Sequence, residues 1–292
     1  MHSPLISVVI PLYNKEDSIL ETVDSVFNQS FKDFELLIID DGSTDRSVAL
    51  LGKIQDKRLR IVSKPNGGVS DARNFGAKLA KADFIFYLDA DDLLLDDCLL
   101  TFSDLLSKNE DIYVFTANFK IIKNTSEQIF CSYLKEGIVS NPLKMLWNRK
   151  IFPRTGAMLF NKKCFDEIGF FRTDITIYED FDFIINLLKK YSVVSTPKIV
   201  LAYLLDYNSL SQKRVPLNKE LAYYLNLKGK PFFEKLIFAE NIYAAYKKRI
   251  KLKDKSATTY LWKKNKNYLV YFIIAFSYRK FLIFNQKIKK LC

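Results

Sequence analysis

The chain has 292 residues, 49% of them hydrophobic, which is enough for one large α/β domain or for a domain with an appendage. The only histidine is His2, and the four cysteines are scattered without a CxxC pair, which argues against Ser-His-Asp or Cys-His chemistry and against zinc or thiolate metal sites. The net charge of +12 is uneven, because residues 228–292 carry +14 and the rest of the chain carries −2.

Strand-like and helix-like segments alternate through the first hundred residues. Short apolar, β-branched runs predict strands at 5–10, 34–39, 59–62 and 83–88. Apolar residues at helical spacing predict helices over 19–27 and about 72–80, and Ser43 or Thr44 is expected to cap a helix after the second strand. The first run has no basic segment before it and stops at Pro11, so it is predicted to be a strand and no secretory signal. This alternation predicts a mostly parallel sheet with helices on both faces.

Polar residues follow each predicted strand directly. They are Tyr13-Asn14, Asp40-Asp41, Asn66-Gly67-Gly68 and the run Asp89-Ala90-Asp91-Asp92. Ligands of open α/β sheets bind beyond the carboxyl ends of the strands. We therefore expect these four loops to meet at one edge of the sheet.

Three carboxylates in the run 89–92 repel one another at the tip of a hydrophobic strand. Such a cluster is tolerable when a cation lies between the carboxylates, and a divalent ion held by few carboxylates usually also holds a phosphate. An all-oxygen site suits Mg²⁺ or Mn²⁺. The alternative is an acidic turn that caps the following helix.

Residues 110–205 are less regular, and the chain after about residue 217 is helical, basic and aromatic. Strands are predicted at 156–160, 193–194 and 199–205. An amphipathic helix is predicted over 178–191; it begins with Glu179-Asp180 and ends with Lys189-Lys190, as the helix dipole favours. We expect one domain over 1–215, made of two halves at about 1–110 and about 110–215. A helical extension is expected over 216–292.

Five sequence blocks stand in a recognisable order between residues 5 and 205: 8–16 (VVIPLYNKE), 36–45 (LLIIDDGSTD), 66–74 (NGGVSDARN), 89–92 (DADD) and 179–180 (ED). Together they resemble the inverting family 2 glycosyltransferases of the GT-A fold. That resemblance implies attack by an acceptor hydroxyl on the anomeric carbon of a nucleotide sugar, with a nucleoside diphosphate as the leaving group. A cation on the diphosphate would stabilise the charge that develops as the bond breaks.

The resemblance implies that 1–215 is the catalytic domain, with the nucleotide-sugar half at about 1–110 and the acceptor half at about 110–215. It also implies roles for individual residues. Asp180 is expected to be the general base, Asp91 the main metal ligand and Asp92 a second or supporting ligand. Residues expected to bind the nucleotide sugar, of which the pattern favours a UDP-sugar, are Pro11, Tyr13, Asn14, Glu16, Asp40, Asp41, Gly68, Arg73, Asp89, Ala90 and Asp91. Residues expected on the acceptor side are Gly156, Ala157 and Glu179. For Glu179 and Asp180 the alternative is a purely electrostatic role at a helix N-terminus, and for Asp40 it is a turn.

The sequence departs from the family in one place. Members often carry Tyr-Arg-x-His where this chain has Tyr203-Leu204-Leu205-Asp206, which leaves any phosphate or metal contact of that arginine and histidine in doubt. Two other functions stay open. A sugar nucleotidyltransferase would need a glycine-rich basic loop near the first strand, which Pro11-Leu12-Tyr13-Asn14 lacks. A non-catalytic nucleotide- or membrane-binding module would not need Asp91 and Asp180.

The basic tail predicts contact with an anionic membrane surface. Clusters at 247–253 and 263–266 flank Trp262 and the apolar run 268–276, which is too short to span a bilayer. The expected location is therefore the inner face of the cytoplasmic membrane, where a lipid-linked glycan acceptor for lipopolysaccharide or capsule synthesis would be found. A core helix packed on the catalytic domain is the alternative. Nucleic acid is not expected as a partner, because no motif supports it.

Overall fold

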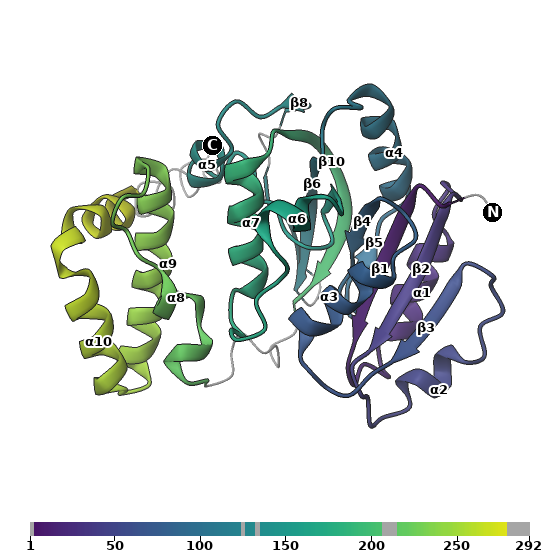
Figure 1. Cartoon of the computed structure of the whole chain (residues 1–292), viewed down its shortest axis with the longest axis horizontal. Helices are drawn as coiled ribbons and strands as arrows, with labels where there is room; N and C mark the ends of the chain where they lie inside the picture. The colour runs from purple at the N-terminus through teal and green to yellow at the C-terminus, as the bar shows by residue number, and fades with distance from the viewer. Residues whose placement is uncertain (1–2, 124–125, 132–134, 206–214, 279–292) are drawn as a thin grey trace. The chain divides into compact units, whose positions relative to one another are not determined.

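A computed structural model of the chain describes residues 3–123, 126–131, 135–205 and 215–278 (Figure 1). The chain divides into two compact units, Met1–Lys213 and Arg214–Cys292. We call the first the sheet unit and the second the helical unit.

The sheet unit is built on a ten-stranded mixed sheet whose main path runs β3-β2-β1-β4-β9-β6-β10-β5. Its strands are β1 Ile6–Leu12, β2 Phe34–Asp40, β3 Leu59–Ser63, β4 Phe84–Tyr87, β5 Leu93–Leu94, β6 Val114–Lys123, β7 Ser126–Ile129, β8 Gly137–Ile138, β9 Met158–Asn161 and β10 Val193–Leu204. Its helices are α1 Ile19–Phe27, α2 Ser47–Leu51, α3 Val69–Leu79, α4 Cys98–Lys108, α5 Pro142–Trp147, α6 Cys164–Ile168 and α7 Glu179–Lys190.

The strand directions bring distant loops to one edge of this sheet. Strands β1, β2, β3 and β4 are parallel, and β6 is parallel to β10. Strand β9 lies between β4 and β6 and is antiparallel to both, so it begins on the side where they end, and its amino end lies beside the carboxyl end of β4. We call this side, where β1–β4, β6 and β10 end and β9 begins, the carboxyl edge.

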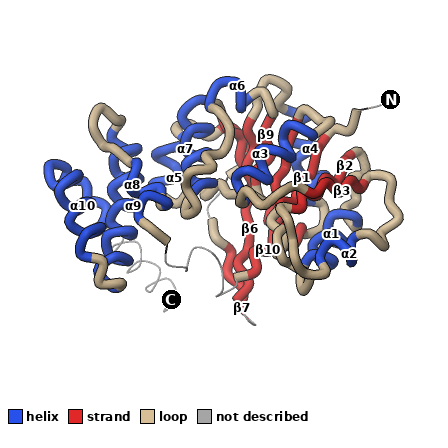
Figure 2. Tube along the Cα trace, turned by 60° about the horizontal axis from the view of Figure 1, so that its bottom comes forward, coloured by secondary structure: helices blue, strands red, loops and turns tan. Residues whose placement is uncertain are grey.

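Helices cover both faces of the sheet, as the alternating side chains of β1 require. Val8 and Ile10 belong to a buried cluster that includes residues of α1 and α4. Val9 points to the opposite face, where it touches Gly76 of α3 so closely that a larger residue than glycine would clash. Helix α7 packs through an aromatic cluster that joins β4 to the helix, since Tyr87 contacts Phe171 and Phe171 stacks on Phe183. Figure 2 shows α1 and α3 on opposite sides of the strands. The predicted α/β architecture is confirmed.

Two local predictions were wrong. Helix α2 begins at Ser47 after Arg46, so neither Ser43 nor Thr44 caps it, because Ser43 is engaged by the loop after β1. The strands expected at 193–194 and 199–205 form one strand, β10. The register of β10 against β6 shifts between Ser195 and Ile199. The strand therefore continues past Pro197 with a local irregularity in its pairing.

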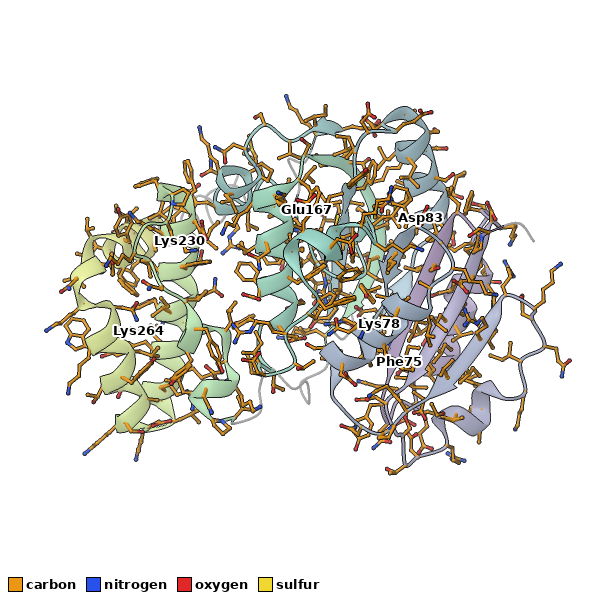
Figure 3. All side chains as sticks on the ribbon, in the orientation of Figure 1. Phe75, Lys78, Asp83, Glu167, Lys230 and Lys264 are labelled. Carbon is orange, nitrogen blue, oxygen red and sulfur yellow. The ribbon has the colours of Figure 1, made fainter. Side chains whose placement is uncertain are left out.

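The helical unit contains η2 Leu217–Lys219, α8 Leu221–Tyr224, α9 Phe232–Lys251, α10 Lys255–Asn265 and η3 Lys266–Tyr268, and residues 269–278 are again helical. Arg249 is buried and binds Glu220 at 2.7 Å and Asp254 at 3.1 Å. Lys230 lies 3.6 Å from the buried Glu234, and Lys264 donates to the backbone carbonyl of Tyr223 (Figure 3). Over the described parts of both units, no helix is both long and apolar enough to cross a bilayer.

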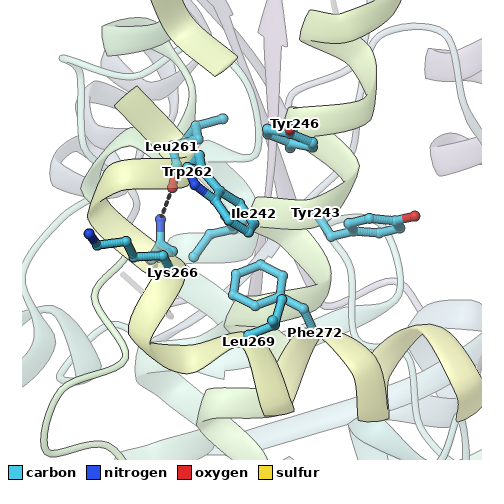
Figure 4. A pocket seen from close by; sticks show the side chains of 9 residues that line it. Ile242, Tyr243, Tyr246, Leu261, Trp262, Lys266, Leu269 and Phe272 are labelled. Atoms are coloured by element: carbon cyan, nitrogen blue, oxygen red, sulfur yellow. Dashed lines mark hydrogen bonds between the residues drawn. The ribbon is translucent and has the colours of Figure 1, made fainter. Parts of the chain in front are cut away.

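A cavity of about 110 Å³ opens between the helices of the helical unit. Its lining combines Ile242, Tyr243 and Tyr246 of α9 with residues that follow along α10 and beyond, namely Leu261, Trp262, Asn265, Lys266, Leu269 and Phe272 (Figure 4). Trp262 is half exposed at 50% of its surface, and Leu269 is 46% exposed. Apolar surface is therefore available next to lysine side chains in this unit.

Candidate active site

The backbone of the run 89–92 is fixed by helix α1. The amide of Asp92 donates to the carbonyl of Asp89 at 3.1 Å, which closes a turn. The carbonyl of Ala90 accepts from Ser18 Oγ at 2.9 Å and from Thr22 Oγ1 at 3.1 Å. This turn, at the carboxyl edge after β4, therefore presents its carboxylates from a rigid support.

Each carboxylate of the run has a basic partner from a different element. Asp89 accepts from Arg73 Nη2 at 2.8 Å, and Asp91 accepts from Lys15 Nζ. Asp92 accepts from the amide of Leu204 at 3.1 Å, and its other oxygen lies 3.9 Å from Arg154 Nη2. Each of the three carboxylates therefore has a basic side chain of its own as a partner.

The pKa values of Asp89 and Asp92 move in opposite directions. Burial would raise the pKa of Asp89, but the guanidinium of Arg73 holds it below its ordinary value. Burial raises the pKa of Asp92 well above its ordinary value, and the neighbouring Asp89 and Asp91 add to that rise against the pull of Arg154. Asp92 Oδ2 is buried without a hydrogen bond. Asp89 is therefore the more acidic of these two carboxyl groups.

Arg73 joins the run 89–92 to the start of helix α7. Its Nη1 donates to Glu179 at 3.2 Å, across 106 residues of sequence. Its side chain is only 4% exposed, and its backbone carbonyl accepts from Tyr87. Burial alone would lower the pKa of Arg73, yet Asp89, Glu179 and Asp180 together raise it. Arg73 is therefore a permanently charged bridge between the two acidic segments.

Helix α7 begins with the two acidic residues that follow an unusual backbone conformation. Tyr178 has a φ of 65°, in the left-handed region that non-glycine residues seldom adopt, and its side chain is 46% exposed. Asp180 is half-buried and accepts from the amide of Phe181 at 2.7 Å. Burial and the adjacent Asp180 raise the pKa of Glu179 to about 7. One of the two carboxyl groups is thus partly protonated at neutral pH.

The loop after β1 is joined to the loop after β2. Thr44 N donates to Asn14 Oδ1 at 2.8 Å, and the amide of Asn14 donates to Ser43 Oγ at 3.1 Å. Arg46 N and Nε both donate to Glu16 at 3.0 Å. Pro11 is buried in β1, whereas the ring of Tyr13 is 48% exposed. Asn14 and Glu16 therefore shape this loop, and Tyr13 is the residue that offers a free face.

Asp40 and Asp41 organise the other two loops of the carboxyl edge. Asp40 accepts from the amide of Ser43 at 2.9 Å, which is a turn of the kind that aspartate favours. Asp41 is buried and accepts from Lys64 Nζ at 2.5 Å and from the amides of Gly67 at 2.9 Å and Gly68 at 2.7 Å. Gly68 has a φ of 87°, so its position favours glycine. The carboxylate of Asp41 holds this glycine turn in place.

The segment before β9 contributes a further basic side chain to the carboxyl edge. Arg154 lies over the ring of Tyr203 at 3.7 Å and donates from Nε to the carbonyl of Thr155 at 3.2 Å. Gly156 has a φ of 85° beside Leu201, and Ala157 is fully buried with its carbonyl bonded to Ala117. Of the segment Tyr203-Leu204-Leu205-Asp206, the last residue lies outside the described residues.

The oxygen atoms at this edge fit a divalent ion that takes most of its coordinating atoms from a bound phosphate. Across the described residues no three His, Cys, Asp or Glu side chains form a group that could hold a metal ion. Asp91 offers a carboxylate that is 31% exposed, whereas Asp92 is 1% exposed. An oxygen site of this kind suits Mg²⁺ or Mn²⁺ when phosphate oxygens supply the remaining ligands. Asp91 is the residue that fits this role best.

Three basic residues of the edge were not singled out from the sequence: Lys15, Lys64 and Arg154. Each lies close to the end or the start of a strand at the carboxyl edge. This position next to a strand is the sequence signal that could have identified it. Lys64 directly follows β3; burial opposes its charge, but Asp41 and Asp71 raise its pKa above the ordinary value. Arg154 precedes the expected acceptor-side residues Gly156 and Ala157, but its contact with Asp92 was not predictable, because β9 enters the sheet antiparallel between β4 and β6.

Comparison with known proteins relates this chain to one family. The sequence profile of glycosyl transferase family 2 matches residues 7–173. An uncharacterized glycosyltransferase of Haemophilus influenzae is 42% identical over 102 residues, which is 34% of this chain and 41% of that protein. The chondroitin synthase of Pasteurella multocida is 40% identical over 118 residues, or 39% of this chain and 12% of the synthase. The chain thus spans well under half the length of these two relatives.

A second Haemophilus influenzae glycosyltransferase extends the similarity along the chain. It is 29% identical over 247 residues, or 77% of this chain and 76% of that protein. Among solved structures, Staphylococcus aureus TarS 1–349 in complex with UDP-GlcNAc has a TM-score of 0.64 at 20% identity, covering 81% of this chain and 66% of that chain. At this identity the likeness shows the fold.

Proposed function

The chain belongs to glycosyl transferase family 2, and on this premise we propose that it transfers a sugar from a UDP-sugar to a hydroxyl group of a glycan or lipid-linked glycan. The single observation that carries the proposal is the Arg73 bridge, with 2.8 Å to Asp89 and 3.2 Å to Glu179. It joins the acidic run after β4 to the acidic start of α7. Donor and acceptor groups would therefore be held close together, as a direct displacement needs.

The donor would occupy the carboxyl edge between the loops after β1, β2 and β4. The exposed ring of Tyr13 can stack on a uracil base. Three of the four acceptor positions on the Asp41 carboxylate are used by Lys64, Gly67 and Gly68, so one remains for the imide N–H of the base. Asp89 would bind the ribose, and Asp91 would lie at the diphosphate.

Asp180 is proposed as the general base. It would accept the proton of the acceptor hydroxyl as that oxygen attacks the anomeric carbon and the bond to the diphosphate breaks. One displacement inverts the anomeric centre, and a single carboxylate base is sufficient because the diphosphate leaves without a general acid. Glu179, one residue earlier and about 100° round the helix, is bound to Arg73 and would position the base.

Asp91, supported by Asp92, is proposed to hold Mg²⁺ or Mn²⁺. The ion would supply positive charge to the departing diphosphate. Asp92, buried and bonded to the amide of Leu204, would keep the loop that carries Asp91 in place. Arg154 stands 3.9 Å from Asp92 and would add positive charge from the opposite side.

The acceptor is proposed to be presented at a membrane surface. The described helical unit, residues 215–278, carries 13 basic and 4 acidic residues. Trp262 and Leu269 expose apolar surface next to Lys266 (Figure 4). Exposed aromatic and aliphatic side chains among lysines suit the interface of an anionic bilayer. Synthesis of a cell-surface polysaccharide at the inner face of the cytoplasmic membrane would fit such a position.

UDP release tests the proposed reaction. The full chain, incubated with a panel of UDP-sugars, Mn²⁺ and a membrane extract as acceptor source, should release UDP with at least one donor. Hydrolysis of that donor should be slower without the extract. If no UDP-sugar gives release while another nucleotide sugar does, the proposed donor class is wrong.

A further inference from the structure

The acidic run after β4 carries its own set of cations. Asp89 binds Arg73, Asp91 binds Lys15, and Asp92 lies 3.9 Å from Arg154. These cations come from α3, from the loop after β1 and from the segment before β9. The repulsion within the run is therefore relieved by three side chains of this protein.

Two of the three cations are held in place by other contacts. Arg73 also binds Glu179 at 3.2 Å, and its guanidinium lies 5.5 Å from the centre of the Phe171 ring. Arg154 lies over Tyr203 and donates to the carbonyl of Thr155. Their side chains are 4% and 16% exposed. Neither guanidinium can leave its carboxylate without losing several further interactions.

Lys15 differs from both arginines. Its side chain is 35% exposed, and its ammonium group bonds to Asp91 and to no other side chain of the described residues. The backbone amide of Lys15 is fixed by a 2.9 Å hydrogen bond to Ser47 Oγ, so the side chain can move while the backbone stays in place. A lysine ammonium is a compact charge on a flexible stem. A partly exposed pair of this kind is weak enough to be exchanged.

Asp91 is also the most exposed carboxylate of the three, at 31%, beside the place proposed for the diphosphate. A divalent ion that binds Asp91 would compete with the ammonium group of Lys15 for this carboxylate. The released ammonium group would then lie next to the negative charge of the bound diphosphate, which it can bind through charge-assisted hydrogen bonds.

We propose that Lys15 is an exchangeable cation: its ammonium group binds Asp91 in the free enzyme and moves to the diphosphate when the metal-bound donor enters. This rests on the proposed UDP-sugar site. It makes Lys15 a substrate-binding residue and gives the free enzyme a low affinity for the metal alone. Metal and nucleotide would consequently bind as a pair.

Two binding measurements on the full chain test this without any turnover. The first is Mn²⁺ binding in the absence of nucleotide, followed by the EPR signal of free Mn²⁺. The second is UDP binding at a saturating concentration of Mn²⁺, followed by calorimetry. The variant is Lys15→Met, and the matched control is Lys57→Met, an exposed lysine before β3. Circular dichroism checks that both variants are folded.

We expect Lys15→Met to bind Mn²⁺ roughly fivefold more tightly than wild type, the amount expected for loss of a partly exposed competing ion pair. We also expect it to bind UDP at saturating Mn²⁺ about tenfold more weakly, as loss of a hydrogen bond to a charged group predicts. Lys57→Met should change neither value.

Unchanged Mn²⁺ binding in Lys15→Met would overturn the exchange, whatever happens to UDP. Tighter Mn²⁺ binding with unchanged UDP binding would overturn the move to the diphosphate. Failure of wild type to bind UDP at all, with the Mn²⁺ result as expected, would instead refute the proposed donor and with it the transfer of Lys15 to that donor.

Discussion

The carboxyl edge of the sheet unit and the helical unit differ in their balance of acidic and basic side chains. At the edge, acidic and basic side chains from distant segments are matched nearly one to one, as in the contacts of Asp89 with Arg73 and Asp41 with Lys64. In the helical unit the acids Glu220, Glu234 and Asp254 are bound within the fold, and the described residues 215–278 keep an excess of basic over acidic side chains. Matched charges fix a geometry, whereas surplus charges favour adhesion to an oppositely charged surface.

The largest expected effect concerns the acidic start of helix α7. Asp180→Asn should lower turnover about a thousandfold, because removal of a general base costs this much, while UDP binding stays the same. The matched control is Asp182→Asn on the same helix, which should keep turnover within a few fold of wild type. Steady-state UDP release with the active donor measures both. Near-normal turnover of Asp180→Asn would mean that another group is the base.

Removal of the Arg73 bridge should cost stability. Arg73→Met leaves the charge of Asp89 without its buried partner, so the free energy of unfolding should fall by about 3–5 kcal/mol. Arg46, exposed on the surface, pairs with Glu16, and Arg46→Met should leave stability nearly unchanged. Urea denaturation of both variants measures the difference. Equal small effects would show that the matched charges of the edge are not structurally important.

Neutralising the surplus lysines should change membrane binding without changing stability. The triple variant Lys247→Gln, Lys263→Gln and Lys266→Gln removes three exposed charges. Its affinity for vesicles that contain phosphatidylglycerol should fall on the order of a hundredfold at low salt, since each lysine near such a surface contributes roughly 1 kcal/mol. Co-sedimentation measures this. The same change at the exposed Lys53, Lys57 and Lys108 of the sheet unit should have little effect, and equal losses in both triples would refute a dedicated surface.

The smallest effect is a pH dependence carried by Glu179. Its pKa is raised from 4.5 to about 7, so the folded chain keeps a proton that the unfolded chain releases. The free energy of unfolding should therefore fall as the pH rises from about 4.5 to 7, by on the order of 2 kcal/mol. Glu179→Gln should remove this part of the slope, and Glu110→Gln, at an exposed site, should not. Denaturation at several pH values tests the sign.

The sequence was sufficient to predict the architecture of the sheet unit in outline. Alternating apolar runs and polar loops predicted the parallel strands, and the positions of Tyr13, Asp41 and Asp89 after strand ends predicted their common edge. The partners of the carboxylates were not predictable. Lys15 and Arg154 reach Asp91 and Asp92 only through tertiary contacts, and β9 had to enter the sheet antiparallel for Arg154 to reach the edge.

The same limit applies to the acidic run itself. From sequence, three close carboxylates indicated a shared cation, because like charges must be neutralised. In the folded chain they bind separate basic side chains, which the local sequence does not contain. Sequence patterns report what each strand and helix buries, whereas pairing between charges depends on which loops the topology brings together.

Binding of UDP in the presence of Mn²⁺ tests the central claim most directly, namely that the carboxyl edge holds the diphosphate at Asp91. Calorimetry should show binding to wild type and a loss of at least about tenfold in Asp91→Asn. Asp83→Asn alters an exposed aspartate just before the opposite end of β4 and should bind UDP as wild type does (Figure 3). Equal affinity of Asp91→Asn and wild type would contradict the account.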